Sequence, residues 1–223
     1  MSSNNDFEKQ WLNKLQKGLI KVGREDLFLE LIKKKESHDT IDWSSILMKK
    51  FNNTLNDDQI ADVMCSCACL APRTTLEACK LEFAQSGELH KTHKLLQQTF
   101  EKMIRQYKDL NEEQMEFLRK NGWGMAGKLE GNTIIATKIP KDFYEYFKAS
   151  GSKQKKFHYC HCPRIRDVFL KGSEKKISPE YCYCGAGFYK DLWEYILSKP
   201  VKVEILKSLM KGDNICTICI HLK

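Results

Sequence analysis

Several features are missing from this chain of 223 residues, and each absence excludes a class of protein. No apolar run approaches the roughly 18 residues that a membrane-spanning helix needs, so we expect no membrane span. The first residues, Met1 to Asp6, are polar and lack the basic and apolar segments of a secretory signal, which favours a cytoplasmic location. No repeat of solenoid type is present, so a stacked repeat architecture is excluded.

The chain has a formal net charge of +8, but it lacks the patterns of a nucleic-acid-binding protein. Its lysine groups, such as Lys33 to Lys35 and Lys49 to Lys50, are scattered and interleaved with acids. There is no helix-turn-helix pattern and no paired Cys/His finger spacing. We therefore expect no nucleic-acid partner. One basic stretch brackets Cys160, where positive charge would favour thiolates, and it consists of Lys153, Lys155, Lys156, Arg164 and Arg166.

Cysteine is abundant, with ten residues in a chain whose 42% hydrophobic content suffices for a core without cross-links. In a cytoplasmic protein such cysteines are usually reduced, metal-bound or redox-active. Seven of them form three closely spaced groups, which are Cys65, Cys67 and Cys69, then Cys160 and Cys162, and finally Cys182 and Cys184. In an extended segment alternate side chains share a face, so each of the two later pairs would present two thiols on one side.

Convergent thiolates predict a zinc site, because zinc accepts four Cys or His ligands in tetrahedral geometry. Cys160, Cys162, Cys182 and Cys184 are the first candidates, although their one-residue spacing is tighter than that of zinc ribbons. A thiolate from Cys65, Cys67 or Cys69 would complete the shell if a tight pair supplied only one ligand. An iron-sulfur cluster is the alternative cofactor, but the spacing matches no ferredoxin pattern.

Other residues near these groups have weaker assignments. His158 would lie on the same extended face as Cys160 and Cys162 and is an alternative ligand, with a backbone-bonded structural histidine as the equal alternative. Cys79 falls on an apolar helical stripe and is assigned to the core. Cys216 and Cys219 are three apart in an expected strand, face opposite ways and are assigned to packing.

Hydrophobic periodicity predicts an α+β fold with two regions. Residues 1–121 have apolar positions at three- and four-residue intervals and are expected to form a mainly helical region. Residues 122–223 are expected to form a cysteine-rich α+β domain with an antiparallel sheet. Its signals are a hairpin turn at Gly131-Asn132 and the alternating apolar segments around Val203 and Ile218, with a turn at Lys211 to Asn214 between them.

Two groups of motifs resemble known families. The run from Tyr181 to Leu222, with Gly185 to Phe188 opening a helix and Lys211 to Cys216 preceding a final strand, resembles 4-vinyl-reductase-type domains. Those small-molecule-binding domains are related in fold to TRAPP transport subunits and to haem-based nitric-oxide sensor domains. More closely, roughly residues 60 to 223 resemble an uncharacterised cysteine-rich family of anaerobic prokaryotes. This second resemblance rests on Gly122 to Gly124, Gly127 to Asn132, His161 to Arg164 and Tyr181 to Phe188.

The resemblance implies a ligand-binding role, and two classes of function follow. The first is a metal-thiolate protein that binds a small molecule in a hydrophobic pocket of the α+β domain and acts as a sensor. A homodimer is one oligomeric state that the sequence leaves open. Aromatic residues near the cysteines are candidates for the pocket or for ordinary core packing, namely Trp123, Phe157, Tyr159, Tyr181, Tyr183, Phe188 and Trp193. The second is a metal-dependent hydrolase of a small cyclic amino-acid-like substrate, for which no acid or base stands out. An iron-sulfur redox protein is the remaining alternative.

Overall fold

A computed structural model of the chain describes residues 4–107 and 110–222. The chain forms two compact units, and each unit is assembled from several segments. The first contains the described residues up to 69 together with 140–187 and 209–214. The second contains residues 70–139, 188–208 and those from 215 onward. The helical first part of the chain therefore contributes to both units.

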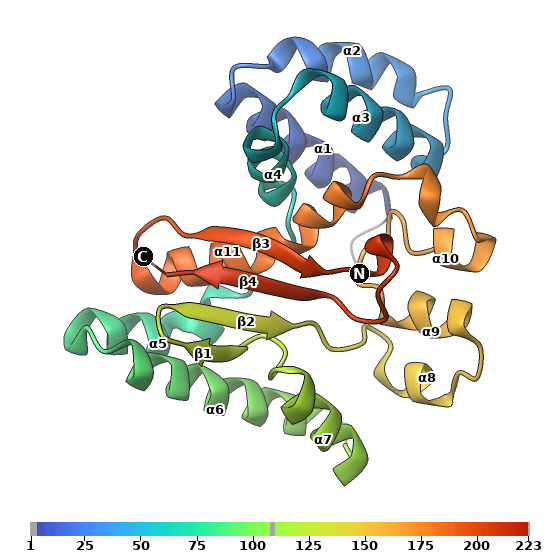
Figure 1. Ribbon diagram of the computed structural model, residues 1–223. Coiled ribbons are helices and arrows are strands. Elements are labelled where there is room, and N and C mark those ends of the chain that lie inside the picture. Colours follow the sequence, from blue (N-terminus) through green and yellow to red (C-terminus); the bar gives the residue numbers. More distant parts are fainter. Residues whose placement is uncertain (1–3, 108–109, 223) are drawn as a thin grey trace. The chain divides into compact units, whose positions relative to one another are not determined.

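The first unit is helical, with a group of four helices, α1 to α4, at its N-terminal end (Figure 1). Its helices are α1 (Asn4–Lys21), α2 (Glu25–Lys35), α3 (Thr40–Thr54), α4 (Asp57–Ser66), α8 (Phe143–Lys148), α9 (Ser152–Tyr159) and α10 (Val168–Lys171). Short 3-10 helices follow at η1 (Glu174–Lys176), η2 (Pro179–Cys182) and η3 (Leu209–Lys211), and α11 (Tyr183–Leu197) begins in this unit. Buried side chains at helical spacing form its core, among them Leu15, Leu31, Trp43, Leu47 and Val63.

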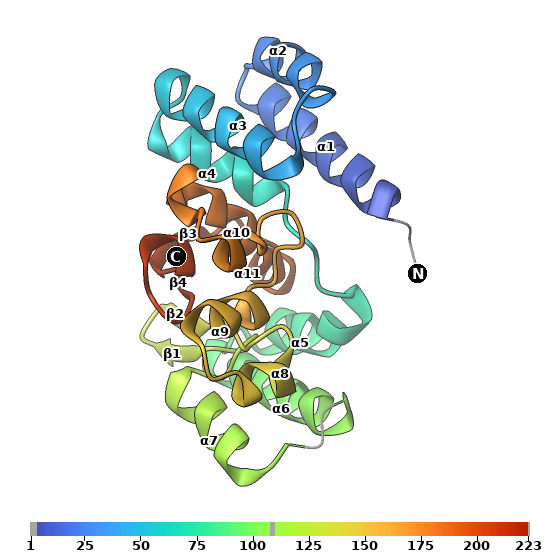
Figure 2. The same ribbon diagram turned by 90° about the vertical axis from the view of Figure 1, so that its right-hand side faces the viewer.

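The second unit packs helices against one sheet. Its elements are α5 (Arg73–Ser86), α6 (Leu89–Tyr107), α7 (Glu112–Asn121), the remainder of α11, and the strands β1 (Lys128–Glu130), β2 (Thr133–Thr137), β3 (Lys202–Lys207) and β4 (Thr217–His221). The strands are antiparallel in the order β1-β2-β4-β3. Helices α5, α6 and α11 lie on one face of this sheet (Figures 1 and 2). Alternate strand residues such as Ile134, Ile218 and Ile220 are buried.

Local sequence signals set the helix boundaries. Asn56 and Asn111 each form a capping box. The asparagine side chain accepts a hydrogen bond from the backbone N–H three residues later, and the glutamine side chain at that later position accepts one from the asparagine backbone N–H. Gly87 and Gly122 end α5 and α7 in the left-handed conformation, with φ of 66° and 99°. These boundaries, the hairpin turn after β1 and the final antiparallel pair confirm the α+β expectation.

Among the described helices, none combines the length and the apolar character that crossing a membrane requires.

Candidate functional site

Two cysteine groups that are far apart in the sequence meet where the end of α4 packs against the start of α11. Gly187 permits this approach, because a Cβ at that position would lie 2.1 Å from the carbonyl oxygen of Cys65. The Cys184 thiol donates a hydrogen bond to the Cys67 carbonyl oxygen at 3.4 Å, across 117 positions of sequence. The first cysteine group and the last therefore belong to one local structure in the first unit.

The first group is divided by the end of α4. Cys65 lies buried in the last turn of this helix, and Cys67 is its buried C-cap residue. The Cys67 thiol donates to the carbonyl oxygen of Val63 at 3.5 Å. Cys69 lies beyond the helix and is exposed. Both buried members of this group thus contact the start of α11 through their backbones, Cys65 at Gly187 and Cys67 at Cys184.

The last group is not extended, and the expectation that Cys182 and Cys184 share one face of an extended segment is wrong. Cys182 ends η2, which begins at Pro179, and Cys184 lies in the first turn of α11. A proline is well accommodated at the first position of a helix, so this segment starts helical structure earlier than expected. Successive helical residues are rotated by about 100°, so side chains two residues apart, such as those of Cys182 and Cys184, point to nearly opposite sides.

The middle group also departs from an extended strand. Cys160 is the C-cap of α9 and has extended φ and ψ, and Cys162 lies in the following turn, where its carbonyl accepts from the Arg166 N–H at 3.1 Å. His158 lies within α9, so the expected shared face with the two cysteines is wrong. Its Nδ1 lies 3.4 Å from Oδ2 of Asp142, which also forms an ion pair with Arg166.

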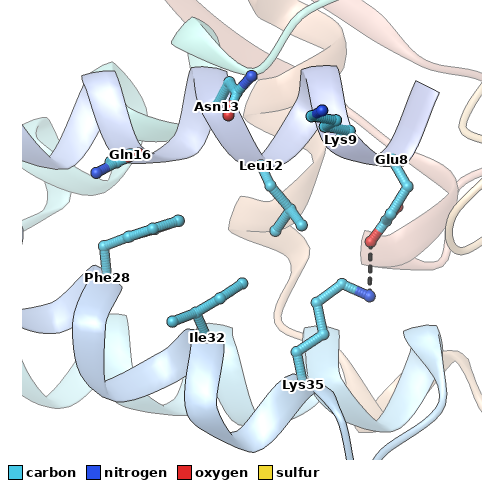
Figure 3. Close-up of a pocket in the computed structure, with 8 residues that line it drawn as sticks. All are labelled: Glu8, Lys9, Leu12, Asn13, Gln16, Phe28, Ile32 and Lys35. Atoms are coloured by element: carbon cyan, nitrogen blue, oxygen red, sulfur yellow. Dashed lines mark ion pairs between the residues drawn. The ribbon is translucent and has the colours of Figure 1, made fainter. Parts of the chain in front are cut away.

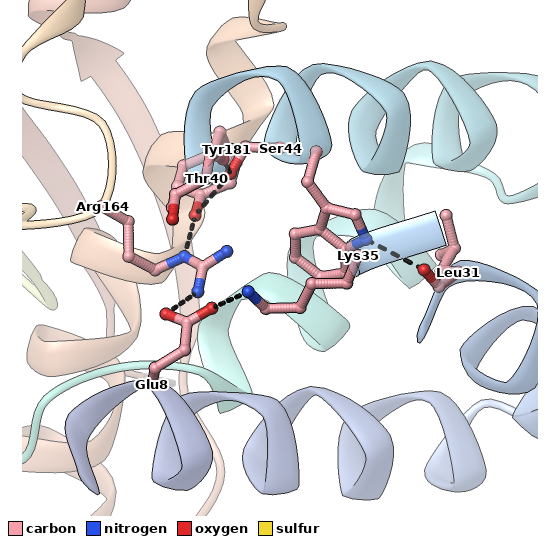
Figure 4. A network of polar contacts seen from close by, with 8 residues as sticks. Glu8, Leu31, Lys35, Thr40, Ser44, Arg164 and Tyr181 are labelled. Carbon is pink, nitrogen blue, oxygen red and sulfur yellow. Dashed lines mark hydrogen bonds and ion pairs between the residues drawn. The ribbon is translucent and has the colours of Figure 1, made fainter. Parts of the chain in front are cut away.

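Arg164 is a buried cation beside these cysteines, with 5% of its surface exposed. Its Nε donates to the Tyr181 hydroxyl at 2.8 Å, and its Nη1 pairs with Glu8, whose other oxygen lies 2.9 Å from Lys35 Nζ (Figure 4). The guanidinium also stacks 3.8 Å from the ring centroid of Trp11. Its Nη2 is buried and has no hydrogen-bond partner among the described residues.

The electrostatics of this cluster favour a neutral thiol at Cys67. Burial, followed by the neighbouring Cys184 thiol, raises the pKa of Cys67 well above its usual range, and Arg164 only partly opposes this effect. Burial likewise raises the pKa of Tyr181, with Arg164 opposing and Cys162 and Cys184 adding to it. At Cys67 burial therefore outweighs the lowering of the pKa by Arg164. A bound cation would reverse this balance by stabilising the thiolate.

A groove lies between α1 and α2 and shares two residues, Glu8 and Lys35, with the Arg164 network. It has a volume of about 450 Å³ and is lined by Glu8, Lys9, Leu12, Asn13, Gln16, Phe28, Ile32 and Lys35. Figure 3 shows Leu12, Phe28 and Ile32 directed toward one another, with Glu8 and Lys35 at one end. Burial opposes ionisation of Glu8, but Arg164 and Lys35 outweigh it and hold its pKa below its usual range.

The aromatic residues that flank the cysteines are divided between the two units. Tyr159 and Tyr181 are buried in the first unit, and Trp193 is buried in the second. Tyr181 stacks on Trp11 with ring centroids 6.2 Å apart. These three rings are core residues, as the packing interpretation predicted. Cys79 is also buried, as expected, and burial raises its pKa to about 11.

One cluster was missed by sequence reasoning. Glu204, Cys219 and His221 lie together on β3 and β4, with one potential ligand atom of each within 4.8 Å of the others. Cys219 is buried, as its packing assignment implied, but that assignment overlooked its two neighbours. The available signal was the Cys-x-His spacing in an alternating strand, which places both side chains on one face.

Comparison with known proteins gives one partial match. Residues 136–223 are similar to a family of unknown function, DUF6144. This match contains the Cys160 and Cys182 groups and the whole of β3 and β4. No curated protein and no solved structure matches the chain.

Proposed function

We propose that this chain is a cytoplasmic zinc-thiolate protein that binds a small molecule and acts as a sensor or regulator. The observation that supports this proposal best is the contact of the Cys184 thiol with the Cys67 backbone beside the buried Arg164. Cys67, Cys162 and Cys184 would hold the ion, with a further ligand from Cys65, Cys160 or Cys182. The ion would neutralise the thiolates and link segments that are distant in sequence.

The thiols suit such an ion by their chemistry, but among the described residues only Glu204, Cys219 and His221 form a group of three whose ligand atoms already lie within 4.8 Å of one another, so the ion would have to draw the thiols together. Thiols are soft donors that suit zinc. These thiols come from segments that are far apart in the sequence. Zinc with several thiolates carries net negative charge, which Arg164 would offset. The Nη2 of Arg164, which has no acceptor within the described part of the chain, would gain one in a thiolate. The donor set and the unsatisfied guanidinium nitrogen therefore support the same assignment.

The groove between α1 and α2 is the proposed small-molecule site. Its apolar floor and charged end suit an amphipathic ligand that carries an anionic or zwitterionic group. Glu8 lines the groove and pairs with Arg164, so a ligand that competes for Lys35 or Glu8 would perturb the surroundings of the cysteines. The resemblance of Tyr181 to Leu222 to 4-vinyl-reductase-type domains would favour ligand binding by the chain, but it does not extend to this groove.

Zinc content tests the metal part of the proposal. Protein purified without oxygen should contain zinc by elemental analysis, and Cys67→Ser and Cys184→Ser should each lose one equivalent relative to the wild type. Cys79→Ala, which removes a core thiol outside the cluster, should keep the wild-type content. Equal metal content in all four proteins would contradict the thiolate centre. Visible colour together with stoichiometric iron would show that the centre is an iron-sulfur cluster and not a zinc site.

Binding of a fluorescent probe tests the groove. The apolar anion 1-anilinonaphthalene-8-sulfonate should bind the folded protein, and Phe28→Ala should weaken that binding about tenfold because the groove loses an aromatic wall. Leu29→Ala is the matched control, since Leu29 is the next residue of α2 and is 54% exposed. Fluorescence titration measures both affinities. Unchanged affinity in Phe28→Ala would remove the groove as the ligand site.

A further inference from the structure

The sheet of the second unit carries a group of three metal-binding residue types on neighbouring strands. In the register of β3 and β4, Glu204 pairs with Cys219, and Lys202 pairs with His221. Cys219 and His221 are two residues apart on β4, so their side chains share a face with Glu204. Each of the two strands thus contributes ligands to one point on the sheet.

The separations of His221 from Cys219 and from Glu204 are compatible with ligands around one metal ion, and the His221–Glu204 separation is long for a hydrogen bond. Nε2 of His221 lies 3.5 Å from Sγ of Cys219 and 3.4 Å from Oε2 of Glu204. A nitrogen-to-oxygen hydrogen bond is usually about 2.7–3.2 Å long. Around a tetrahedral zinc ion, bond lengths near 2.3 Å to sulfur and 2.1 Å to nitrogen or oxygen place the ligand atoms about 3.6 Å (S to N) and about 3.4 Å (N to O) apart.

We propose that Glu204, Cys219 and His221 form a second zinc site, with three protein ligands and one open position. The site is distinct from the thiol cluster, which lies in the other unit. Zinc binding forms bonds to the Cys219 sulfur, to Nε2 of His221 and to a Glu204 oxygen, and the Cys219 proton leaves to solvent. The open position takes water or a small anionic or thiol ligand.

Charge and exposure support this assignment. The carboxylates of Glu204 and Glu130 both act on Cys219. Two carboxylates beside the thiol favour a divalent cation at this position. The side chains of Glu204 and His221 are 55% and 37% exposed, so an ion reaches the site from solvent.

The alternative is an ordinary exposed ion pair between Glu204 and protonated His221 beside a packing cysteine. That pair would be worth little, since exposed pairs contribute about 0–1 kcal/mol. An ion pair between Glu204 and His221 also gives no reason for the Cys219 sulfur to lie beside the imidazole. The two interpretations differ in one measurable property, which is affinity for zinc.

Zinc titration of the full chain by calorimetry tests the proposal. Glu204→Gln and His221→Asn should each weaken one equivalent of zinc binding by at least about tenfold, because each removes a direct ligand and loss of an outer-shell partner already costs about 10–100-fold. Cobalt provides an independent probe, and Cys219→Ser should remove part of its thiolate charge-transfer absorption.

Glu130→Gln is the matched control, because this exposed carboxylate acts on Cys219 but is not a ligand in the proposed site. It should keep zinc affinity within about threefold of the wild type, against the loss expected for a direct ligand. Thermal unfolding of each variant confirms that the fold persists. Equal zinc stoichiometry and affinity in wild type, Glu204→Gln and His221→Asn would overturn the proposal. If the thiol cluster binds no zinc, the wild type should bind one equivalent of zinc instead of two. The weaker zinc binding expected for Glu204→Gln and His221→Asn would be the same in either case.

Discussion

Arg164→Ala should lower the free energy of unfolding by about 3 kcal/mol, at the lower end of the range for breaking a buried ion pair. The substitution leaves the Tyr181 hydroxyl and Glu8 without their guanidinium partner and removes the cation that stacks on Trp11. The effect is at the lower end because the Glu8 side chain is 23% exposed and keeps its contact with Lys35. Urea unfolding monitored by circular dichroism measures this change.

Arg73→Ala is the matched control for that experiment. Arg73 also pairs with a carboxylate, that of Asp191, and also lies over an aromatic ring, that of Tyr195, but its side chain is 42% exposed. Its loss should cost less than about 1 kcal/mol. In a double-mutant cycle, Glu8→Gln should cost less in the Arg164→Ala background than in the wild type. Equal costs for the two arginine substitutions would contradict the central role of Arg164.

Gly187→Ala should destabilise the first unit by about 3 kcal/mol, at the upper end of the range for overpacking. The added methyl group would lie 2.1 Å from the Cys65 carbonyl oxygen and 2.7 Å from its Cα. These are backbone atoms, so relief requires α4 and the start of α11 to separate. The same separation should also remove the zinc equivalent that we assign to Cys67 and Cys184. Thermal unfolding and elemental analysis measure the two effects.

Gly151→Ala provides the comparison for Gly187→Ala. The nearest atom to a Cβ at Gly151 is the end of the flexible Gln154 side chain, which can rotate away. Gly151 is also the N-cap of α9, where alanine is modestly worse than glycine. We expect a loss of about 1 kcal/mol or less and unchanged zinc content. A fully stable Gly187→Ala protein with wild-type zinc would show that the close contact at Cys65 is unimportant.

Patterns that depend on near neighbours in sequence predicted much of the fold. Helical periodicity predicted a mainly helical region in the first 121 residues, and within it Asn56, Asn111 and Gly122 are residue types that typically end helices and do so in the structure. Strand alternation and turn residues placed the antiparallel pair β3 and β4. These signals are reliable because capping, turn geometry and amphipathic burial act over a few residues.

The conformation of the cysteine pairs could not be predicted in the same way. Short Cys-x-Cys segments have no periodicity long enough to separate a strand from a helix. The extended assignment was wrong for Cys182 and Cys184 because Pro179 and the following residues begin helical structure. The contact between Cys184 and Cys67 also depends on Gly187, whose role is visible only once α4 lies against α11.

The amino-acid order by itself determined the class of fold, the helix ends and the presence of many thiols, because each follows from local chemistry. Tertiary structure alone decided which side chains meet. The pairing of β3 with β4 brings Glu204 to Cys219 and His221, and the packing of α11 on α4 brings Cys184 to Cys67. Both contacts depend on strand register and helix packing between distant segments. The local sequence pattern shows which side chains share a face but not which distant residue they contact.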